Sequence, residues 1–178
     1  MNKAVLISIK PTWCAKIASG EKTIEVRKTR PRLNPPFKCY IYCPQSADML
    51  WILKERERSL CPDKIADVFK AAKCGGAYRG NGKVIGEFVC DDIFERIVRV
   101  GAICEPPKYC ICDWNMDCTP LDTLLADACL TKDELEKYLD GGVGYGWHIS
   151  NLKIYDTPRE LQEFGVNRPF QSWGYVYE

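Results

Sequence analysis

The sequence is poor in histidine, in net charge and in long apolar segments. His148 is the single histidine among 178 residues, so a metal site built from several histidines is excluded. The 25 Lys and Arg residues nearly balance the 24 Asp and Glu residues, which argues against a non-specific, high-affinity duplex binder. No apolar run approaches the length of a signal peptide or a membrane-spanning helix. These absences predict a soluble, cytoplasmic protein without a membrane partner.

Cysteine, in contrast, is abundant, with 11 residues in the chain. Because no secretory signal is visible and the count is odd, we expect reduced thiols rather than disulfides. One window concentrates candidate metal ligands, namely Cys104, Cys110, Cys112 and Cys118. Its spacing lacks the Cys-x-x-Cys pairs that are typical of structural zinc. We therefore predict surface thiols in an irregular loop and no metal site.

The first 28 residues predict a helix that leads directly into a strand. The helix is expected over Pro11–Ser19, because proline suits the first turn and Gly20 can adopt the left-handed conformation just past the end. The following segment, Thr23–Lys28, alternates with period two, which is typical of a strand. This alternation directs Glu25 and Arg27 to one face and the apolar side chains to the other.

The remaining pattern predicts strands interleaved with short helices. Strands are expected at Val5–Ile9, Lys38–Cys43, Lys83–Val98 with a bend at Gly86, Gly146–Tyr155 and Ser172–Tyr177. Helices are expected at Leu121–Ala128, at Thr131–Leu139 with a Thr131-x-x-Glu134 capping box, and at Pro158–Phe164. The segment 44–81 reads as an insertion with helices at Met49–Arg58 and Asp63–Lys73. This order favours one domain over residues 1–178, of the α+β class, rather than a doubly wound parallel sheet.

The octet that begins at Gly20, Gly-Glu-Lys-Thr-Ile-Glu-Val-Arg, resembles the signature Gly-x-Lys-x-x-Glu-x-Arg of the ASCH (activating signal cointegrator homology) domain family. The segments around it extend the resemblance over nearly the whole chain: Lys10-Pro11-Thr12-Trp13, Gly146-Trp147-His148-Ile149-Ser150 and Gln171-Ser172-Trp173. The likeness is greatest to phage and prophage-type members. It implies a PUA-like fold, a small, partly open β-barrel of about five to seven strands with short peripheral helices, a scaffold much used for RNA binding.

The resemblance places the octet at the mouth of a cleft. A carboxylate there can accept hydrogen bonds from the amino group of a base, while lysine or arginine meets a phosphate. The predicted ligand-binding residues are Lys10, Trp13, Lys22, Glu25, Arg27, Trp147, His148, Ser150, Gln171 and Ser172. The competing interpretation is structural, with the charges forming a surface salt-bridge ladder and the tryptophans packing in the core. A Ser-His hydrolase is not expected, because nothing in the sequence supplies an acid to orient His148.

We therefore predict a module that binds RNA, a nucleotide or a modified nucleoside, without a cofactor. The first alternative is a small hydrolase, either a ribonuclease or an amidohydrolase, with Lys22 and Glu25 as catalytic residues. Some ASCH proteins remove the acetyl group from acetylated cytidine by means of a Lys and a Thr in the signature and a later Glu. Lys22 occupies the lysine position, Glu25 stands where the threonine would be, and the acidic position falls near Ala128. The second alternative is a phage or host regulatory adaptor with a protein partner on the 44–81 insertion, which would require Leu50, Trp51 and Leu53 to be exposed.

Overall fold

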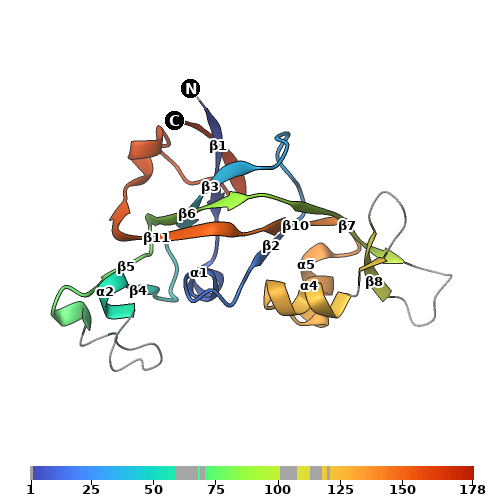
Figure 1. Cartoon of the computed structure of the whole chain (residues 1–178), viewed down its shortest axis with the longest axis horizontal. Coiled ribbons are helices and arrows are strands. Elements are labelled where there is room, and N and C mark those ends of the chain that lie inside the picture. The colour runs from blue at the N-terminus through green and yellow to red at the C-terminus, as the bar shows by residue number, and fades with distance from the viewer. Residues whose placement is uncertain (1, 59–67, 69–70, 101–107, 113–117, 120) are drawn as a thin grey trace. The chain divides into compact units, whose positions relative to one another are not determined.

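The computed structural model describes residues 2–58, 68, 71–100, 108–112, 118–119 and 121–178 (Figure 1). Its helices and strands are mixed along the chain, so the predicted α+β class is confirmed. The chain divides into two compact units, each assembled from separate segments. The first unit comprises Met1–Ser19, Lys38–Phe88 and Asn151–Glu178, and the second comprises Gly20–Phe37 and Val89–Ser150. No helix in these described ranges is long and apolar enough to cross a bilayer.

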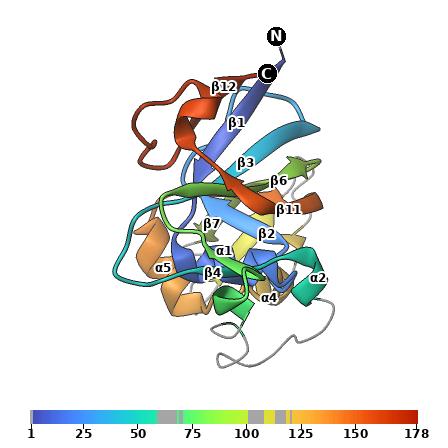
Figure 2. The same ribbon diagram turned by 90° about the vertical axis from the view of Figure 1, so that its left-hand side faces the viewer.

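The first unit is built on a five-stranded sheet in the order β11-β6-β3-β1-β12, which can be followed in Figure 2. Its strands are β1 (Lys3–Ser8), β3 (Phe37–Cys43), β6 (Lys83–Cys90), β11 (Ser150–Arg159) and β12 (Trp173–Tyr177). The central strand β1 pairs in parallel with β3 and antiparallel with β12. One face of this sheet packs on a core that includes Leu6, Tyr40, Val84 and Val176. Both faces of β1 are apolar, so this strand is buried over most of its length.

The helix predicted at the start of the chain is confirmed as α1, Pro11–Ala18. Its first residue is proline, and Gly20 follows it with a φ of +82°, the left-handed conformation that glycine adopts without strain. Cys14 and Ile17 point into the core from one side of the helix. The predicted sequence of helix, glycine and strand is therefore present as the pattern indicated.

The helix predicted over Met49–Arg58 is wrong for most of its length. Trp51–Leu53 forms strand β4, which pairs antiparallel with β5 (Ala77–Arg79), and only Glu55–Arg58 is helical, as α2. The Asn81 side chain accepts a hydrogen bond from Leu50 N (2.8 Å) and donates one to Asp48 O (2.9 Å). This amide satisfies the backbone before β4 and favours the extended chain over a helix. The predicted Asp63–Lys73 helix lies mostly outside the described residues.

The second unit carries a five-stranded sheet in the order β2-β10-β7-β8-β9 and two helices. Its elements are β2 (Ile24–Arg27), β7 (Ile93–Val100), β8 (Lys108–Cys112), β9 (Cys118–Thr119), α4 (Leu121–Ala128), α5 (Lys132–Leu139) and β10 (Gly144–His148). Side chains of both helices join those of β2 and β7 in one core, which includes Ile24, Val26, Ile97, Leu124 and Leu135. The predicted capping box at Thr131 and Glu134 is present at the start of α5.

Two strands that the pattern presented as continuous are each broken in two. Lys83–Val98 divides into β6 and β7 at Asp91 and Asp92, and Gly146–Tyr155 divides into β10 and β11 at Ile149. At these breaks the backbone forms hydrogen bonds with residues that are distant in the sequence. His148 N donates to Asp92 O (3.0 Å), and Ile149 N donates to Thr23 O (2.8 Å). In each case the two halves belong to different sheets. The alternation of side chains along a strand does not show where the chain passes from one sheet to another, so the sequence did not predict these breaks.

Two further predictions about the sheets can be compared with the structure. Among the described residues the strands form open sheets of five, five and two strands, which is not a closed barrel and agrees with the predicted, partly open PUA-like fold. The predicted helix Pro158–Phe164 is shorter, because residues 150–159 belong to β11 and only η1 (Leu161–Phe164) forms a 3₁₀ turn. Gly86 is a point of close approach, since a Cβ there would lie 2.5 Å from Lys153 O. One domain with an insertion at 44–81 stays a prediction.

Candidate functional site

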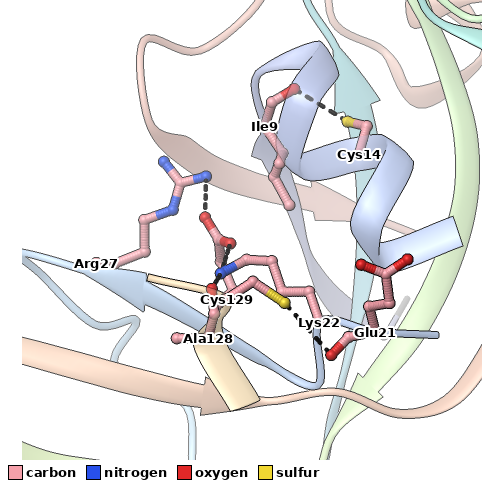
Figure 3. Close-up of polar contacts among 8 residues, drawn as sticks. Ile9, Cys14, Glu21, Lys22, Arg27, Ala128 and Cys129 are labelled. Carbon is pink, nitrogen blue, oxygen red and sulfur yellow. Dashed lines mark hydrogen bonds and ion pairs between the residues drawn. The ribbon is translucent and has the colours of Figure 1, made fainter. Parts of the chain in front are cut away.

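Three charged side chains at the start of the second unit lie in contact, and we call them the charged triad: Lys22, Glu25 and Arg27. The Lys22 ammonium lies 3.3 Å from Glu25 Oε2, and Arg27 Nη2 lies 2.9 Å from Glu25 Oε1 (Figure 3). Only 3%, 5% and 8% of the three residues, respectively, is exposed. One carboxylate is therefore shared by two cations in a nearly closed environment.

Lys22 also joins the start of β2 to the end of helix α4. Its ammonium donates a hydrogen bond of 2.7 Å to the carbonyl oxygen of Ala128, the last residue of the helix (Figure 3). Thr23 N donates to Asp127 O at 2.9 Å in the same corner. A lysine is favourable at this place, because the last carbonyls of a helix have no intrahelical donor and carry partial negative charge. Lys22 therefore makes a hydrogen bond that stabilises the fold in addition to its ion pair with Glu25.

Burial lowers the pKa of Lys22 below the ordinary lysine value of 10.5. Removal from water penalises the ammonium, and this effect exceeds the opposing influence of Glu25, which raises the pKa by its charge and hydrogen bond. Lys22 is therefore more easily deprotonated than an exposed lysine.

Trp147 stands next to the triad on the sheet but is part of the core. In the pairing of β10 with β2, Trp147 lies opposite Glu25 and Tyr145 lies opposite Arg27, so these four side chains share one face. Trp147 is 0% exposed, and its ring centroid lies 6.0 Å from that of Phe37 in an edge-to-face arrangement at 80°. Trp147 is therefore close to Glu25 on the sheet and fully buried, and its role in ligand binding stays a prediction.

His148 and Ser150 are placed differently from the triad. His148 lies opposite Ile24, on the other face of the sheet, and its Nδ1 lies 2.6 Å from Asp91 Oδ1. The Ser150 hydroxyl donates to Val89 O at 2.9 Å. Asp91 is an acid that orients His148, and the sequence analysis did not identify it. Asp91 lies 57 residues before His148, between β6 and β7, where the sequence predicted one continuous strand. The hydrogen bond from His148 lowers the pKa of Asp91.

The other predicted ligand-binding residues belong to the first unit. Lys10 is exposed at the N-cap of α1, and Trp13 is half-buried with Lys16 Nζ 5.2 Å from its ring centroid. Gln171 is exposed, and Ser172 O accepts a hydrogen bond of 2.8 Å from Ser8 N. The structure thus brings Lys22, Glu25 and Arg27 into contact, while a role for the remaining residues in one common site stays a prediction.

The cysteines that the structure describes are thiols: Cys14, Cys39, Cys43, Cys74, Cys90 and Cys129. Cys129 follows α4 with a φ of +52°, and its thiol donates to Glu21 O at 3.4 Å. Cys104 lies outside the described residues, as do the side chains of Cys110, Cys112 and Cys118. Within the described part of the chain, no group of three or more His, Cys, Asp or Glu side chains could hold a metal ion.

Comparisons with known proteins identify the fold. The chain matches no protein-family model and no curated protein. It is similar to the crystal structure of ASCH from Zymomonas mobilis, at 15% identity and a TM-score of 0.56, over 98% of this chain and 88% of that one. A tyrosine-to-phenylalanine variant and a serine-to-alanine variant of that protein match at the same identity and TM-score, over 99% and 98% of this chain and 92% and 89% of theirs. The chain therefore has the ASCH fold, as the octet indicated.

Proposed function

Starting from the ASCH fold, we propose that this protein binds RNA, a nucleotide or a modified base through Lys22, Glu25 and Arg27. The Glu25 carboxylate accepts hydrogen bonds from the exocyclic amino group of a base. The two cations bind a phosphate or a carbonyl oxygen of the same ligand. With one negative and two positive groups, the triad carries one net positive charge when Lys22 is protonated, which suits a ligand with an anionic group.

The observation that carries this proposal is the burial of the triad. Removing an ion from water costs several kcal/mol, and apolar side chains of similar volume often give equal or greater stability. Three charges in contact, each less than a tenth exposed, are therefore poorly explained by stability alone. Their arrangement favours recognition of a polar ligand, for which such groups are already oriented and partly desolvated.

The exposure of the side chains indicates the direction from which a ligand approaches. The Arg27 side chain is 10% exposed, compared with 7% for Glu25 and 2% for Lys22. A ligand therefore meets Arg27 first and reaches Lys22 only after a local opening of the site. We therefore propose that the phosphate meets Arg27 and that the base lies closer to Glu25.

One observation favours the hydrolase alternative. Because burial lowers the pKa of Lys22, the neutral amine that a base or nucleophile requires forms at a lower pH than in an ordinary lysine. In this alternative Lys22 and Glu25 act on a nucleoside amide such as acetylated cytidine, or on RNA. The adaptor alternative is less favoured, since Leu50 is 4% exposed and Trp51 and Leu53 are half-buried.

Replacing Lys22 with methionine distinguishes binding from catalysis. We expect the variant to lose affinity for nucleotides, and the difference from wild type to shrink as salt is added, because an ionic contact is screened. Calorimetric titration of the four ribonucleoside monophosphates, acetylcytidine and short RNAs, with product analysis of the same samples, provides the measurement. Lys28→Met is the matched control, since Lys28 is an exposed lysine immediately after β2.

The hydrolase alternative predicts a different result for the same variant. Wild-type turnover of acetylcytidine or RNA that disappears in Lys22→Met without loss of substrate affinity would overturn the binding proposal. Because the substitution also removes the hydrogen bond to Ala128 O, its melting temperature must be measured in parallel. An affinity loss counts only at temperatures where the variant is folded.

The protonation of Lys22 can be measured directly. In protein labelled with ¹³C-lysine, we expect the ε-carbon resonance that is absent from Lys22→Met to titrate below the ordinary value of 10.5. In Glu25→Gln the same resonance should titrate lower still, because the substitution removes the charge that favours the ammonium. A Lys22 resonance that titrates at or above the ordinary value would contradict the desolvated environment.

A further inference from the structure

Two fully buried cysteines of the first unit lie where strand β1 leads into helix α1. Cys14 belongs to α1, and Cys43 is the last residue of β3, the strand that pairs with β1 in parallel. Both residues are 0% exposed, and both are thiols. We call them the thiol pair. A buried cysteine often acts only as a small apolar side chain, so the contacts of the two sulfurs decide whether this pair does more.

Ile9, which directly follows β1, connects the two cysteines. The parallel register of β1 and β3 places Ser8 opposite Tyr42, and the next step of the same register places Ile9 opposite Cys43. The hydrogen bond of 2.9 Å from Ile9 N to Tyr42 O continues this pairing. The Cys14 thiol donates to Ile9 O at 3.1 Å (Figure 3). Both thiols therefore border one residue, although they are far apart in the sequence.

The two thiols also interact with each other. A hydrogen bond with Cys14 is the main cause that lowers the pKa of the Cys43 thiol below its ordinary value of 9.0, and burial opposes this effect. Because an S–H group rotates, the Cys14 hydrogen can turn from Ile9 O to the Cys43 sulfur when Cys43 loses its proton. Cys14 thus stabilises the Cys43 thiolate, which is the form of cysteine that reacts with oxidants.

We propose that the thiol pair is a redox switch that hydrogen peroxide converts to a disulfide. The Cys43 thiolate attacks one oxygen of the peroxide, which gives a sulfenic acid and hydroxide. The Cys14 sulfur then attacks the sulfenic sulfur and displaces its oxygen as water. One S–S bond forms, and the two electrons that the sulfurs lose reduce the O–O bond. The peroxide and the two thiol protons together become two water molecules.

The burial of the pair decides which reagents reach it. At 0% exposure neither sulfur meets a bulky reagent in the closed protein, whereas hydrogen peroxide is close to water in size and enters during small local openings. Cys74 is exposed and Cys129 is half-buried, so alkylating reagents modify these two thiols first. The pair can therefore be oxidised after the accessible thiols have been blocked.

The disulfide would close a loop that contains the charged triad. The chain between Cys14 and Cys43 is about 30 residues long and includes the whole octet that begins at Gly20. A cross-link across such a loop removes open conformations of the chain and makes its opening less favourable. In the proposed function a ligand reaches Lys22 only after a local opening, so oxidation is expected to hinder the entry of that ligand.

This effect on ligand entry rests on the proposed function, but formation of the disulfide does not. If the triad variants bind nucleotides as wild type does, the proposed function fails and the redox switch is unaffected. If the pair does not oxidise, the switch fails and nucleotide binding at the triad is unaffected.

Peptide mapping of the full chain after peroxide treatment is the direct experiment. Accessible thiols are first blocked with N-ethylmaleimide under native conditions, peroxide is then added, and the remaining thiols are alkylated after unfolding. We expect peptides linked through Cys14 and Cys43, which are absent without peroxide and disappear after reduction with dithiothreitol. Cys39→Ala is the matched control, because Cys39 is also a 0% exposed cysteine on β3 and its removal should leave the link intact.

Two results of the mapping would overturn the switch. One is that Cys14 and Cys43 are alkylated after unfolding as completely as in untreated protein. The other is that either of them is linked to a different cysteine. Cys14→Ala and Cys43→Ala should each leave the remaining thiol of the pair unlinked, and the wild-type map decides the question if these variants do not fold.

Hydrogen–deuterium exchange provides a second readout, which needs no ligand. The amides of residues 20–27 should exchange about 5-fold more slowly, or slower still, in oxidised than in reduced protein, because the cross-link restricts opening of the loop. Dithiothreitol should restore the original rate. Equal exchange rates in the two forms would show that the disulfide does not control the octet, and the proposed switch would be wrong.

Discussion

Replacing Glu25 with glutamine is expected to weaken binding of a nucleotide or modified base by about 2–5 kcal/mol, which corresponds to about 30-fold or more. The carboxylate accepts hydrogen bonds with both oxygens, whereas the amide has one acceptor oxygen and adds donors that face two cations. Lys22 and Arg27, at 3.3 and 2.9 Å from the present carboxylate, would lose their shared counterion. Calorimetric titration with the nucleotide panel measures the change in affinity.

The same substitution should lower the free energy of unfolding without abolishing the fold. Breaking a buried ion pair by removing one partner costs about 3–5 kcal/mol, but Lys22 can relieve part of this cost by losing its proton. Glu21→Gln is the matched control, because Glu21 is an exposed glutamate four residues earlier. If Glu25→Gln binds every nucleotide as wild type does, the triad is structural and the binding proposal is wrong.

Replacing Trp147 with alanine is expected to lower the free energy of unfolding by about 3–5 kcal/mol. The indole is 0% exposed and contacts Phe37 edge to face, so its removal leaves a cavity in the second unit. For a chain of this length, such a loss corresponds to a decrease in melting temperature of about 6–20 °C. Chemical denaturation and thermal melting followed by circular dichroism measure both quantities.

Trp147→Phe separates packing from stacking at this position. Phenylalanine retains an aromatic contact with Phe37 and should cost less than half as much stability as alanine. If Trp147 instead stacked on a ligand base, alanine would reduce affinity and leave stability nearly unchanged. That outcome would support the ligand-binding role that the resemblance implied for Trp147.

Local patterns predicted the elements that depend on a few neighbouring residues. Leu121–Ala128 forms a helix within the predicted bounds, and Thr131 and Glu134 form the capping box, because both features are specified within one helical turn. The prediction of one long strand over Lys83–Val98 is wrong, because the chain changes sheet at Asp91, whose side chain contacts His148, a residue far along the sequence. Likewise, β4 depends on the Asn81 amide rather than on its own composition.

The candidate site was predictable in the same limited sense. Lys22, Glu25 and Arg27 lie within six residues, so the octet placed them near one another before any fold was known. Their burial and the bond from Lys22 to Ala128 O could not be predicted, since α4 is about 100 residues away in sequence. The lowered pKa of Lys22 follows from that burial, and a charged octet alone suggests an exposed lysine.

The most direct test of the binding proposal is to map where a nucleotide contacts the protein. NMR titration of protein labelled with ¹⁵N-arginine and ¹³C-lysine reports on Arg27 and Lys22, with resonances assigned from Arg27→Lys and Lys22→Met. At least one member of the nucleotide panel should shift both side-chain resonances saturably in wild type. In Glu25→Gln the same shift of the Lys22 resonance should require a nucleotide concentration about 30-fold higher or more. Shifts confined to other lysines and arginines, with Lys22 and Arg27 unchanged at saturation, would contradict the assignment of the triad as the binding site.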